Sequence, residues 1–308
     1  SSGGRGPGPA GTPSTGGPAN PNRGRAAGPG GPGGPSPGSG ATGPGGRTPQ
    51  FFTAPEFPPV ARYVHRAAYL LSMGRPAAEI GLYVPTTSVW LGDTAADQSS
   101  QAMAQRLLES QRDFDWVDEQ ALSSVLRLEG SELKNLSGQG YRAILIPPVT
   151  AISRAALARL EAFAKAGGSV VFLGQVPSMV VGQTFLKAEG PPDLGWATLE
   201  PSGELTPRVL DALPRPDVAL DRPCPAVKVQ HRRWKDADLY FFFNEGDQRQ
   251  ACTASLTGAG RVQVWDAATG RIESLAGALV ENGRASVSLD LGPRETRSIV
   301  VGPQGGAS

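Results

Sequence analysis

Ile80-Gly-Leu-Tyr-Val84 is a short apolar run that ends at Pro85, and two similar runs follow it: Arg142-Ala-Ile-Leu-Ile146, which ends at Pro147, and Ser169-Val-Val-Phe-Leu173. Stretches with helical spacing lie between these runs. Short β-branched runs that alternate with helices are typical of βαβ units around a parallel sheet. The second and third runs are apolar without alternation, as expected for strands covered on both faces. The sequence therefore predicts a small doubly wound parallel-sheet domain.

The helices between these strands are marked by apolar stripes. A helix is expected between Gln98 and Ser110, and a further strand at Phe114-Asp-Trp-Val117. The next crossover helix can be capped by Ser153, and Gly167-Gly168 ends it. Its buried stripe is predicted at Ala156, Leu157, Leu160, Phe163 and Ala164.

A helix is also predicted ahead of the first strand, from Val60 to Met73. Its apolar residues recur at spacings of three and four, and Gly74 and Pro76 follow where a helix should end. The sequence around it offers no obvious partner for the apolar face. We expect this helix to pack on the parallel-sheet domain or on a domain that lies upstream in a longer protein.

The pattern changes near Ala226 to several short alternating strands, among them the aromatic run Leu239-Tyr-Phe-Phe-Phe243. Turn residues separate the strands, as in Asn244-Glu-Gly-Asp247 and Glu281-Asn-Gly283. Short strands at this spacing are typical of an antiparallel β-sandwich. The predicted fold class is thus α/β plus all-β, with an antiparallel β-sandwich after the parallel sheet.

Composition sets the first fifty residues apart, because much of the chain's 41 glycines and 29 prolines lies there. Such a segment cannot bury enough apolar surface to offset about 1–2 kcal/mol of backbone ordering per residue. The predicted organisation is a disordered Gly/Pro-rich segment (1–50), a linking arm and helix (51–79), the α/β domain (80–221), the β-sandwich (222–302) and a tail (303–308).

The overall charge and the apolar content exclude several classes of protein. The formal net charge is +1, so nucleic acid and anionic membranes are not expected partners. The sequence contains no run of eighteen apolar residues, so no membrane span is predicted. The two cysteines, Cys224 and Cys252, are expected to be buried thiols, with a single disulfide as the alternative. The chain begins at Ser1 without an initiator Met, so we expect it to be a piece of a longer protein.

The polar segment that follows the first strand, Pro85 to Asp93, is the predicted ligand site, because ligands lie beyond the carboxyl ends of strands in open α/β sheets. It has neither of the glycine-rich phosphate motifs, so no nucleotide is expected. Its hydroxyls, carboxylate and aromatic ring suit a sugar. The predicted substrate-binding residues are Thr86, Thr87, Ser88, Trp90 and Asp93. The alternative is an ordinary loop in which Trp90 packs under a neighbour.

No residue is predicted to be catalytic. Asp118 and Glu119 follow the second strand, where we expect them to cap the next helix. A nucleophile elbow is absent, and His65 and His231 do not have the spacing of zinc ligands. We expect His231 to be a solvated strand end, and Asn244–Asp247 to be a turn rather than a calcium site. No metal and no cofactor are predicted.

Tyr69-Leu-Leu-Ser-Met-Gly-Arg-Pro76, in the segment 62–83, resembles the part that follows the catalytic barrel in bacterial α-L-rhamnosidases of glycoside hydrolase family 106. Gly140-Tyr-Arg-Ala-Ile-Leu-Ile-Pro147 is similar to the α/β domain that comes next, as is residue range 167–172. Leu239-Tyr-Phe-Phe-Phe-Asn244 and Val264-Trp-Asp-Ala-Ala-Thr-Gly270 are similar to the family's late β-strands. The resemblance covers roughly residues 51–301.

The resemblance implies a C-terminal accessory region of a sugar-cleaving enzyme, with an α/β domain similar to a glutamine amidotransferase fold but without its nucleophilic cysteine. The family's barrel and its catalytic acids should lie upstream of Phe51, and none maps onto this chain. The parent would be secreted or periplasmic, would act on rhamnose-containing glycans, and would need its barrel for activity. Two alternatives stay open: a carbohydrate-binding or scaffolding module that uses exposed aromatics such as Trp234, and a free-standing hydrolase with an unrecognised site.

Overall fold

The computed structural model describes residues 54–182, 184 and 187–303. The predicted segment 1–50 lies outside the described residues, as do residues 51–53 of the predicted arm and 304–308 of the predicted tail. All described residues belong to one compact unit of the chain.

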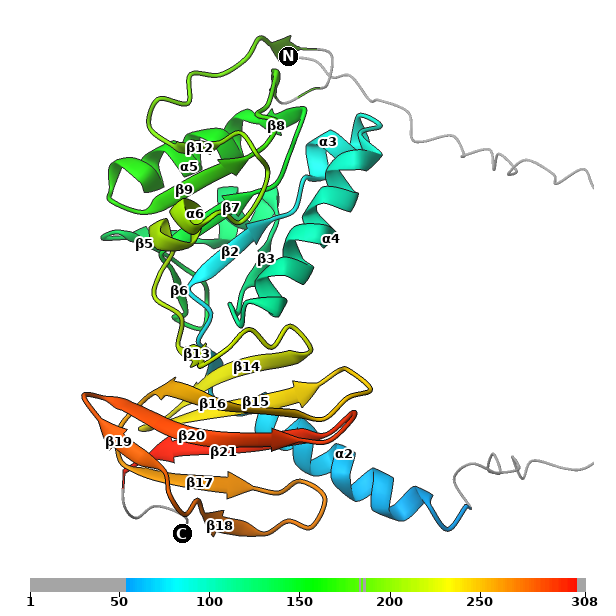
Figure 1. The fold of residues 1–308 in the computed structure, drawn as a ribbon. Coiled ribbons are helices and arrows are strands. Elements are labelled where there is room, and N and C mark those ends of the chain that lie inside the picture. The colour runs from blue at the N-terminus through cyan, green and yellow to red at the C-terminus, as the bar shows by residue number, and fades with distance from the viewer. Residues whose placement is uncertain (1–53, 183, 185–186, 304–308) are drawn as a thin grey trace, which may run out of the picture. The chain divides into compact units, whose positions relative to one another are not determined.

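A five-stranded sheet is the centre of the first half, and all its neighbouring strands are parallel (Figure 1). Its strands, in spatial order, are β12 (Thr198–Glu200), β9 (Ser169–Leu173), β7 (Ala143–Ile146), β2 (Ile80–Tyr83) and β3 (Asp115–Val117). In chain order this is 2-1-3-4-5, a common doubly wound arrangement whose strand order reverses between the first and third strands. The predicted parallel sheet is therefore present, with β12 as an added edge strand.

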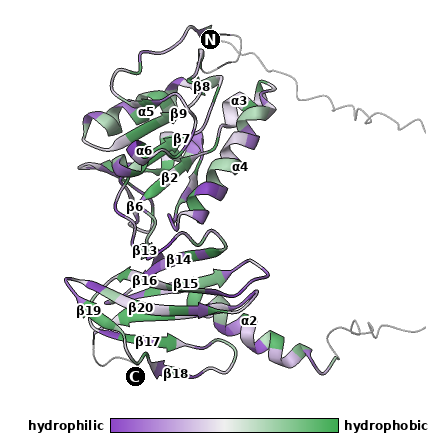
Figure 2. Cartoon of the chain, in the orientation of Figure 1, coloured by the Kyte–Doolittle hydropathy of each residue, from purple (hydrophilic) through white to green (hydrophobic). Residues whose placement is uncertain are grey.

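Amphipathic helices cover both faces of this sheet. One face packs against α4 (Thr94–Glu109) and α6 (Pro207–Ala212), around Leu82, Met103 and Leu145. The other packs against α5 (Arg154–Lys165) and the π-helical turn η1 (Ala121–Val125), around buried side chains that include Leu122, Ile144, Leu160 and Phe163. Burial on both faces explains why β2, β7 and β9 are hydrophobic along their length (Figure 2).

Two small three-stranded sheets flank the parallel sheet, and neither was predicted. The first is antiparallel and consists of β4 (Arg127–Glu129), β5 (Glu132–Lys134) and β6 (Gly140–Tyr141). The second contains β8 (Ala151–Ser153), β10 (Met179–Val181) and β11 (Ala188–Glu189), with a parallel and an antiparallel pairing.

The second half of the chain is built from two antiparallel sheets. The six-stranded sheet has the order β1 (Arg75–Pro76), β14 (Val227–Trp234), β15 (Ala237–Asn244), β21 (Thr296–Gly302), β17 (Arg261–Trp265) and β18 (Ile272–Ser274). The four-stranded sheet has the order β13 (Val218–Leu220), β16 (Gln250–Thr257), β20 (Arg284–Leu291) and β19 (Leu279–Glu281). Alternate side chains of both sheets, such as Tyr240, Phe242, Leu256 and Leu289, share one hydrophobic cluster.

Both cysteines lie in that cluster. Cys224 and Cys252 are both buried and free of a disulfide, as predicted. Burial, and then the neighbouring Cys224 thiol, raise the pKa of Cys252 to about 12.

Helix α2 (Phe57–Ser72) packs on the six-stranded antiparallel sheet, so the expectation that it packs on the parallel-sheet domain is wrong. Its Leu70 contacts a small cluster with Leu239 and Val300. Leu239 and Val300 alternate along their strands with residues that point into the shared cluster. They therefore lie on the opposite face of the sheet, which α2 covers. Among the described residues, no helix is long and apolar enough to cross a membrane.

Candidate functional site

The carboxyl edge of the parallel sheet is the first candidate site, because its strand order reverses between β2 and β7. The segment predicted to bind substrate lies at this edge. Most of it forms the short helix α3 (Thr86–Trp90), so the segment is not the ordinary loop that the alternative assumed. Val89 donates its backbone N–H to the carbonyl of Pro85 at 3.0 Å, which closes the first turn.

Glu119 is buried at this edge and joins three elements. Its carboxylate accepts hydrogen bonds from the Tyr83 hydroxyl (2.6 Å), from the backbone N–H and hydroxyl of Thr87 (3.1 and 2.9 Å) and from the backbone N–H of Ser153 (3.2 Å). Burial, together with the Glu119 charge and hydrogen bond, raises the pKa of Tyr83 well above its ordinary value. Glu119 thus connects β2, α3 and the start of α5.

Asp118 and Glu119 were both predicted to cap the next helix, and only Asp118 does so. Asp118 accepts a hydrogen bond of 2.6 Å from the backbone N–H of Ala121, at the start of η1. Glu119 instead points toward Tyr83 and Thr87. The sequence could have indicated this, because adjacent residues that leave a strand point in opposite directions.

Ser88 is completely buried and holds α3 to the segment after β7. Its hydroxyl donates to the carbonyl of Ala151 at 2.8 Å and accepts from the backbone N–H groups of Thr150 (3.2 Å) and Ala151 (2.9 Å). Thr87 is also buried and is engaged by Glu119. These two hydroxyls therefore maintain the local structure.

Asp93 and Thr86 have local partners as well. Asp93 caps α4 by accepting from the backbone N–H of Ala96 (3.1 Å), and its second oxygen accepts from the Thr150 hydroxyl (2.8 Å). The Thr86 hydroxyl lies 3.5 Å from the carbonyl of Val84, at the limit of a hydrogen bond. Trp90 differs from the other four because 73% of its surface is exposed. The alternative in which Trp90 packs under a neighbour is therefore wrong.

This geometry limits the chemistry of the edge. Both carboxylate oxygens of Glu119, and both of Asp93, already accept hydrogen bonds from the chain. A glycosidase needs a carboxyl group within hydrogen-bond reach of the substrate. Neither side chain is arranged for that role, which leaves Trp90 as the large exposed surface of the predicted site.

A second cluster surrounds His231, and the prediction of a solvated strand end is wrong. The ring is 2% exposed and lies between Asp217 (Nδ1 to Oδ2, 2.8 Å) and Asp238 (Nε2 to Oδ1, 2.8 Å). It stacks on Tyr240 with ring centroids 4.2 Å apart. The alternation Val227, Val229, His231 could have predicted the burial, because these positions share one face of β14.

The electrostatics of this cluster favour a charged histidine. Burial alone would lower the pKa of His231, but the hydrogen bonds and charges of Asp217 and Asp238 outweigh it, and the pKa is raised. The backbone N–H of His231 also donates to Asp113 at 3.2 Å. Burial raises the pKa of Asp113 to about 6. Asp113 therefore links the segment between α4 and β3 to His231 on strand β14.

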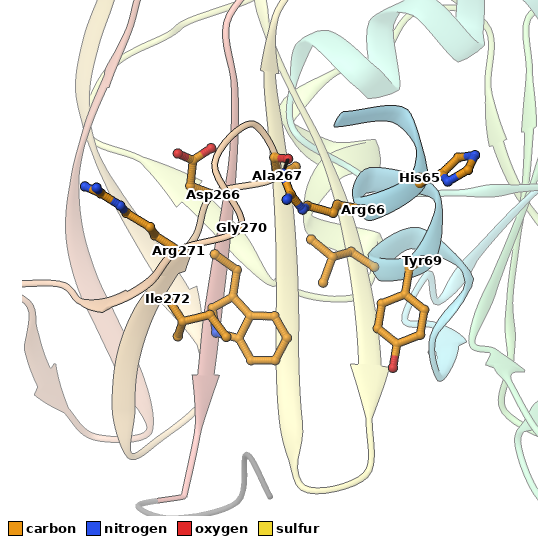
Figure 3. A pocket seen from close by; sticks show the side chains of 10 residues that line it. His65, Arg66, Tyr69, Asp266, Ala267, Gly270, Arg271 and Ile272 are labelled. Carbon is orange, nitrogen blue, oxygen red and sulfur yellow. Dashed lines mark hydrogen bonds between the residues drawn. The ribbon is translucent and has the colours of Figure 1, made fainter. Parts of the chain in front are cut away.

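A pocket of about 340 Å³ lies between α2 and the turn that joins β17 to β18 (Figure 3). Arg66 donates to the carbonyls of Ala267 (3.1 Å) and Ala268 (2.9 Å) and holds the turn against the helix. Trp265, in the pocket wall, makes an edge contact with Trp234. Trp234, predicted as an exposed aromatic, is half-buried and carries the Lys235 ammonium 5.6 Å above its ring.

Within residues 54–303, apart from the three that are not described, no group of three or more His, Cys, Asp and Glu side chains could hold a metal ion. The Asn244–Asp247 segment is a turn, in which the Asn244 side chain accepts from the backbone N–H of Gly246 at 3.0 Å. It also donates to the carbonyls of Gln248, Leu291 and Gly292.

Three solved structures share the fold. A rhamnosidase from Novosphingobium sp. PP1Y has a TM-score of 0.58 at 21% identity, over 82% of this chain and 25% of that chain. A beta-galactosidase from Bacillus circulans sp. alkalophilus has a TM-score of 0.51 at 11% identity, over 79% and 44% of the two chains. Alpha-L-fucosidase isoenzyme 2 from Paenibacillus thiaminolyticus has a TM-score of 0.50 at 11% identity, over 80% and 51%.

At these identities the likeness concerns the fold alone, and the chain spans about a quarter of the length of the rhamnosidase. No curated protein matches the sequence. Residues 52–190 match the family described as alpha-L-rhamnosidase, glycoside hydrolase family 106. The resemblance predicted from the motifs is therefore confirmed over residues 52–190, which are similar to glycoside hydrolase family 106.

Proposed function

We propose that this chain is a C-terminal accessory region of a glycoside hydrolase that acts on rhamnose-containing glycans. It would support, from the side, the active site of a barrel that this chain does not supply. The observation that carries the proposal is the state of Glu119 and Asp93, whose oxygens are occupied by hydrogen bonds within the chain at the edge where a ligand would lie. The family match supports the substrate class.

The finer description of the fold is part of the same proposal. We assign residues 80–221 to an amidotransferase-like α/β domain, supported by its parallel strand order, although β13 within this range pairs with β16 of the antiparallel sheet. Its cysteine nucleophile is missing, because Cys224 and Cys252 belong to the antiparallel cluster. We assign residues 222–302 to a β-sandwich, supported by the cluster that the two antiparallel sheets share.

Trp90 is the residue of the predicted segment that we place nearest the sugar. It is 73% exposed and stands on α3, next to the strand-order reversal. Aromatic rings pack well on the apolar faces of sugars. The hydroxyls of Thr87 and Ser88 then serve to hold α3 in position for that contact.

Hydrolysis of an aryl α-L-rhamnoside tests the proposal. The chain alone should release no aryl group above a buffer blank, whereas the complete parent protein should be active. In the parent, Trp90→Ala should raise KM by about tenfold or less, as expected for one lost stacking contact of about 1 kcal/mol. Turnover by the chain alone that disappears in Asp93→Asn or Asp118→Asn would show that the catalytic acids are here after all.

A non-catalytic carbohydrate-binding module is the second candidate function. It is favoured by the pocket beside Trp265, which combines an apolar wall with charged side chains at its rim. Titration of the chain with sugars, followed by tryptophan fluorescence, distinguishes binding from scaffolding. Saturable binding supports the module, and its absence leaves the scaffolding role.

A further inference from the structure

Helix α2 carries a second apolar stripe beside the one that faces the six-stranded sheet. Its contacts with that sheet and its turns are made by Tyr63, Arg66 and Leu70. The second stripe recurs at spacings of three and four, as the a and d positions of a heptad repeat do. It forms a seam of five apolar residues along the helix: Phe57, Val60, Val64, Ala67 and Leu71.

The described structure leaves much of this seam uncovered. Val60 and Val64 lie one turn apart and are each 51% exposed. None of residues 57–66 is buried, although this range is more than half of the helix. In Figure 1 the first turns of α2 extend past the strands of the sheet. Large apolar side chains that stay exposed next to each other indicate an interaction surface.

The start of α2 also lacks features that stabilise a helix by itself. Its N-cap residue, Glu56, makes no side-chain capping hydrogen bond, and the first turn contains no acidic residue. Short helices in proteins gain most of their stability from the packing of an amphipathic face. The first half of α2 therefore needs a second partner in addition to the sheet.

The composition of the seam indicates what kind of surface would cover it. The seam contains no charged residue, and Ala61 and Ala68 flank it on the side away from the sheet. The basic residues of the helix, Arg62, His65 and Arg66, fall at other positions of the heptad. An apolar and uncharged partner fits this surface, and the spacing suits the apolar face of another α-helix.

Two observations indicate that the partner belongs to the same polypeptide in the parent protein. This chain covers only 25% of the rhamnosidase that shares its fold, and the family match starts at residue 52, directly ahead of α2. The seam spans about two heptads, fewer than the three or four that indicate a self-supporting coiled coil. A covalently joined domain needs weaker contacts than a free partner, because attachment raises its effective concentration.

We propose that the seam of α2 is the docking surface for the catalytic domain of the parent protein, and that an apolar helix of that domain covers Val60 and Val64. This inference rests on the proposed function, because it takes the missing barrel as the partner. It goes further by naming the surface that holds the two parts together. One helix then binds the antiparallel sheet through Leu70 and the catalytic domain through Val64.

Hydrogen–deuterium exchange of residues 57–66, in the full chain and in the complete parent protein, tests the inference. The backbone amides of this range should exchange at least about tenfold more slowly in the parent, where the seam is covered. Val60→Glu and Val64→Glu should each restore fast exchange in the parent, because a covered seam cannot hold an unpaired carboxylate. In the chain alone both variants should keep the Tm, because both sites are exposed and Glu favours a helix more than Val does.

Leu136→Glu is the matched control, because Leu136 is 82% exposed in the turn between β5 and β6. It should leave the exchange of α2 unchanged in both proteins. Equal exchange of α2 in the chain and the parent, or a parent in which neither seam variant speeds the exchange, would overturn the inference. Self-association of the chain that Val64→Glu abolishes would also overturn it, because the seam would then bind a second copy.

The same measurements separate this inference from the proposed function. A parent that cleaves aryl rhamnosides while residues 57–66 exchange as fast as in the chain alone would refute the docking surface only. Slow exchange of this range in a parent that cleaves no rhamnoside would refute the proposed function only.

Discussion

The Tyr83 hydroxyl donates a 2.6 Å hydrogen bond to the Glu119 carboxylate, and both side chains are buried where β2 and β3 end. Glu119 has no basic side chain among the partners of its carboxylate in the described structure, and hydroxyl and backbone N–H donors surround it instead. Buried carboxylates in such a setting depend on every donor that satisfies them. The pair therefore maintains the edge at which sugar is proposed to meet α3.

Replacing Glu119 tests this dependence. Glu119→Gln retains the shape but turns one acceptor oxygen into a donor that faces other donors, and we expect it to lower the free energy of unfolding by about 2–4 kcal/mol. Tyr83→Phe removes only one of four donors and should cost about 1 kcal/mol. Urea denaturation measures both. The exposed Glu281→Gln should change stability by less than about 0.5 kcal/mol, and an equally small effect of Glu119→Gln would contradict the interpretation.

Stability should depend on pH through the His231 cluster. The pKa of His231 is raised above its ordinary 6.5, so its stabilising contribution is present below pH 6.5 and is lost as the pH rises through the folded-state value. Asp113, raised from 3.8 to about 6, acts in the same direction between those two values. The pKa of Asp217 is lowered, so its contribution is lost only below about pH 3.8. The free energy of unfolding should therefore fall as the pH rises from about 4 to 6, through Asp113, and fall further above pH 6.5, through His231.

His231→Gln should lower stability by about 2–4 kcal/mol at pH 5.5, because Asp217 and Asp238 lose a charged partner. The variant should also lack the fall in the free energy of unfolding that the wild type shows above pH 6.5. Thermal denaturation at several pH values measures both effects. His65→Gln is the control, because His65 is exposed, and it should keep the wild-type profile. A wild-type stability that is flat from pH 5 to 8 would contradict a charged His231.

Gly74 tests the joint between α2 and the six-stranded sheet. It has a φ of +61°, and a Cβ atom would lie 2.0 Å from the backbone carbonyl oxygen of Arg233. We expect Gly74→Ala to cost about 3 kcal/mol or more, because strand β14 itself would have to move. Gly277 has a similar φ of +77° with nothing within 4 Å of the added Cβ, and Gly277→Ala should cost only about 1 kcal/mol. Similar losses in the two variants would show that backbone strain, rather than the close approach, explains Gly74.

The two thiols should be almost unreactive in the folded chain. Burial and the neighbouring Cys224 raise the pKa of Cys252 to about 12, so little thiolate exists near neutral pH. We expect modification at pH 8 by an aromatic disulfide reagent to be roughly a hundredfold slower in the native chain than in urea, with unfolding as the limiting step. Two thiols that react rapidly in the native chain would contradict the burial of this cluster.

The sequence predicts the buried parallel strands of this fold well, but it predicts the edge strand and the contacts between distant elements poorly. β2, β7 and β9 were predictable because strands covered on both faces must be apolar along their length. β12 was not, because Thr198 and Glu200 are polar and the strand lies at the edge of the sheet. Local sequence patterns likewise could not predict which sheet α2 packs on, because Leu239 and Val300 are far from Leu70 in the sequence.

The candidate site shows the same division. The segment 86–93 was located correctly at the carboxyl edge of the sheet, but the roles of its residues could not be predicted. Thr87 and Ser88 look like ligand hydroxyls until their partners Glu119 and Ala151, from other elements, are known. Whether Trp90 contacts sugar stays a prediction.

The packing of α2 has a consequence for dissecting this protein. The family match ends at residue 190, yet Leu70 within it lies against Leu239 and Val300, beyond that boundary. A truncated protein that stops there would leave this helix without the strands that shelter it, and it would also lack β12. The recognisable stretch is shorter than the piece that can fold, so expression boundaries should be drawn after β21.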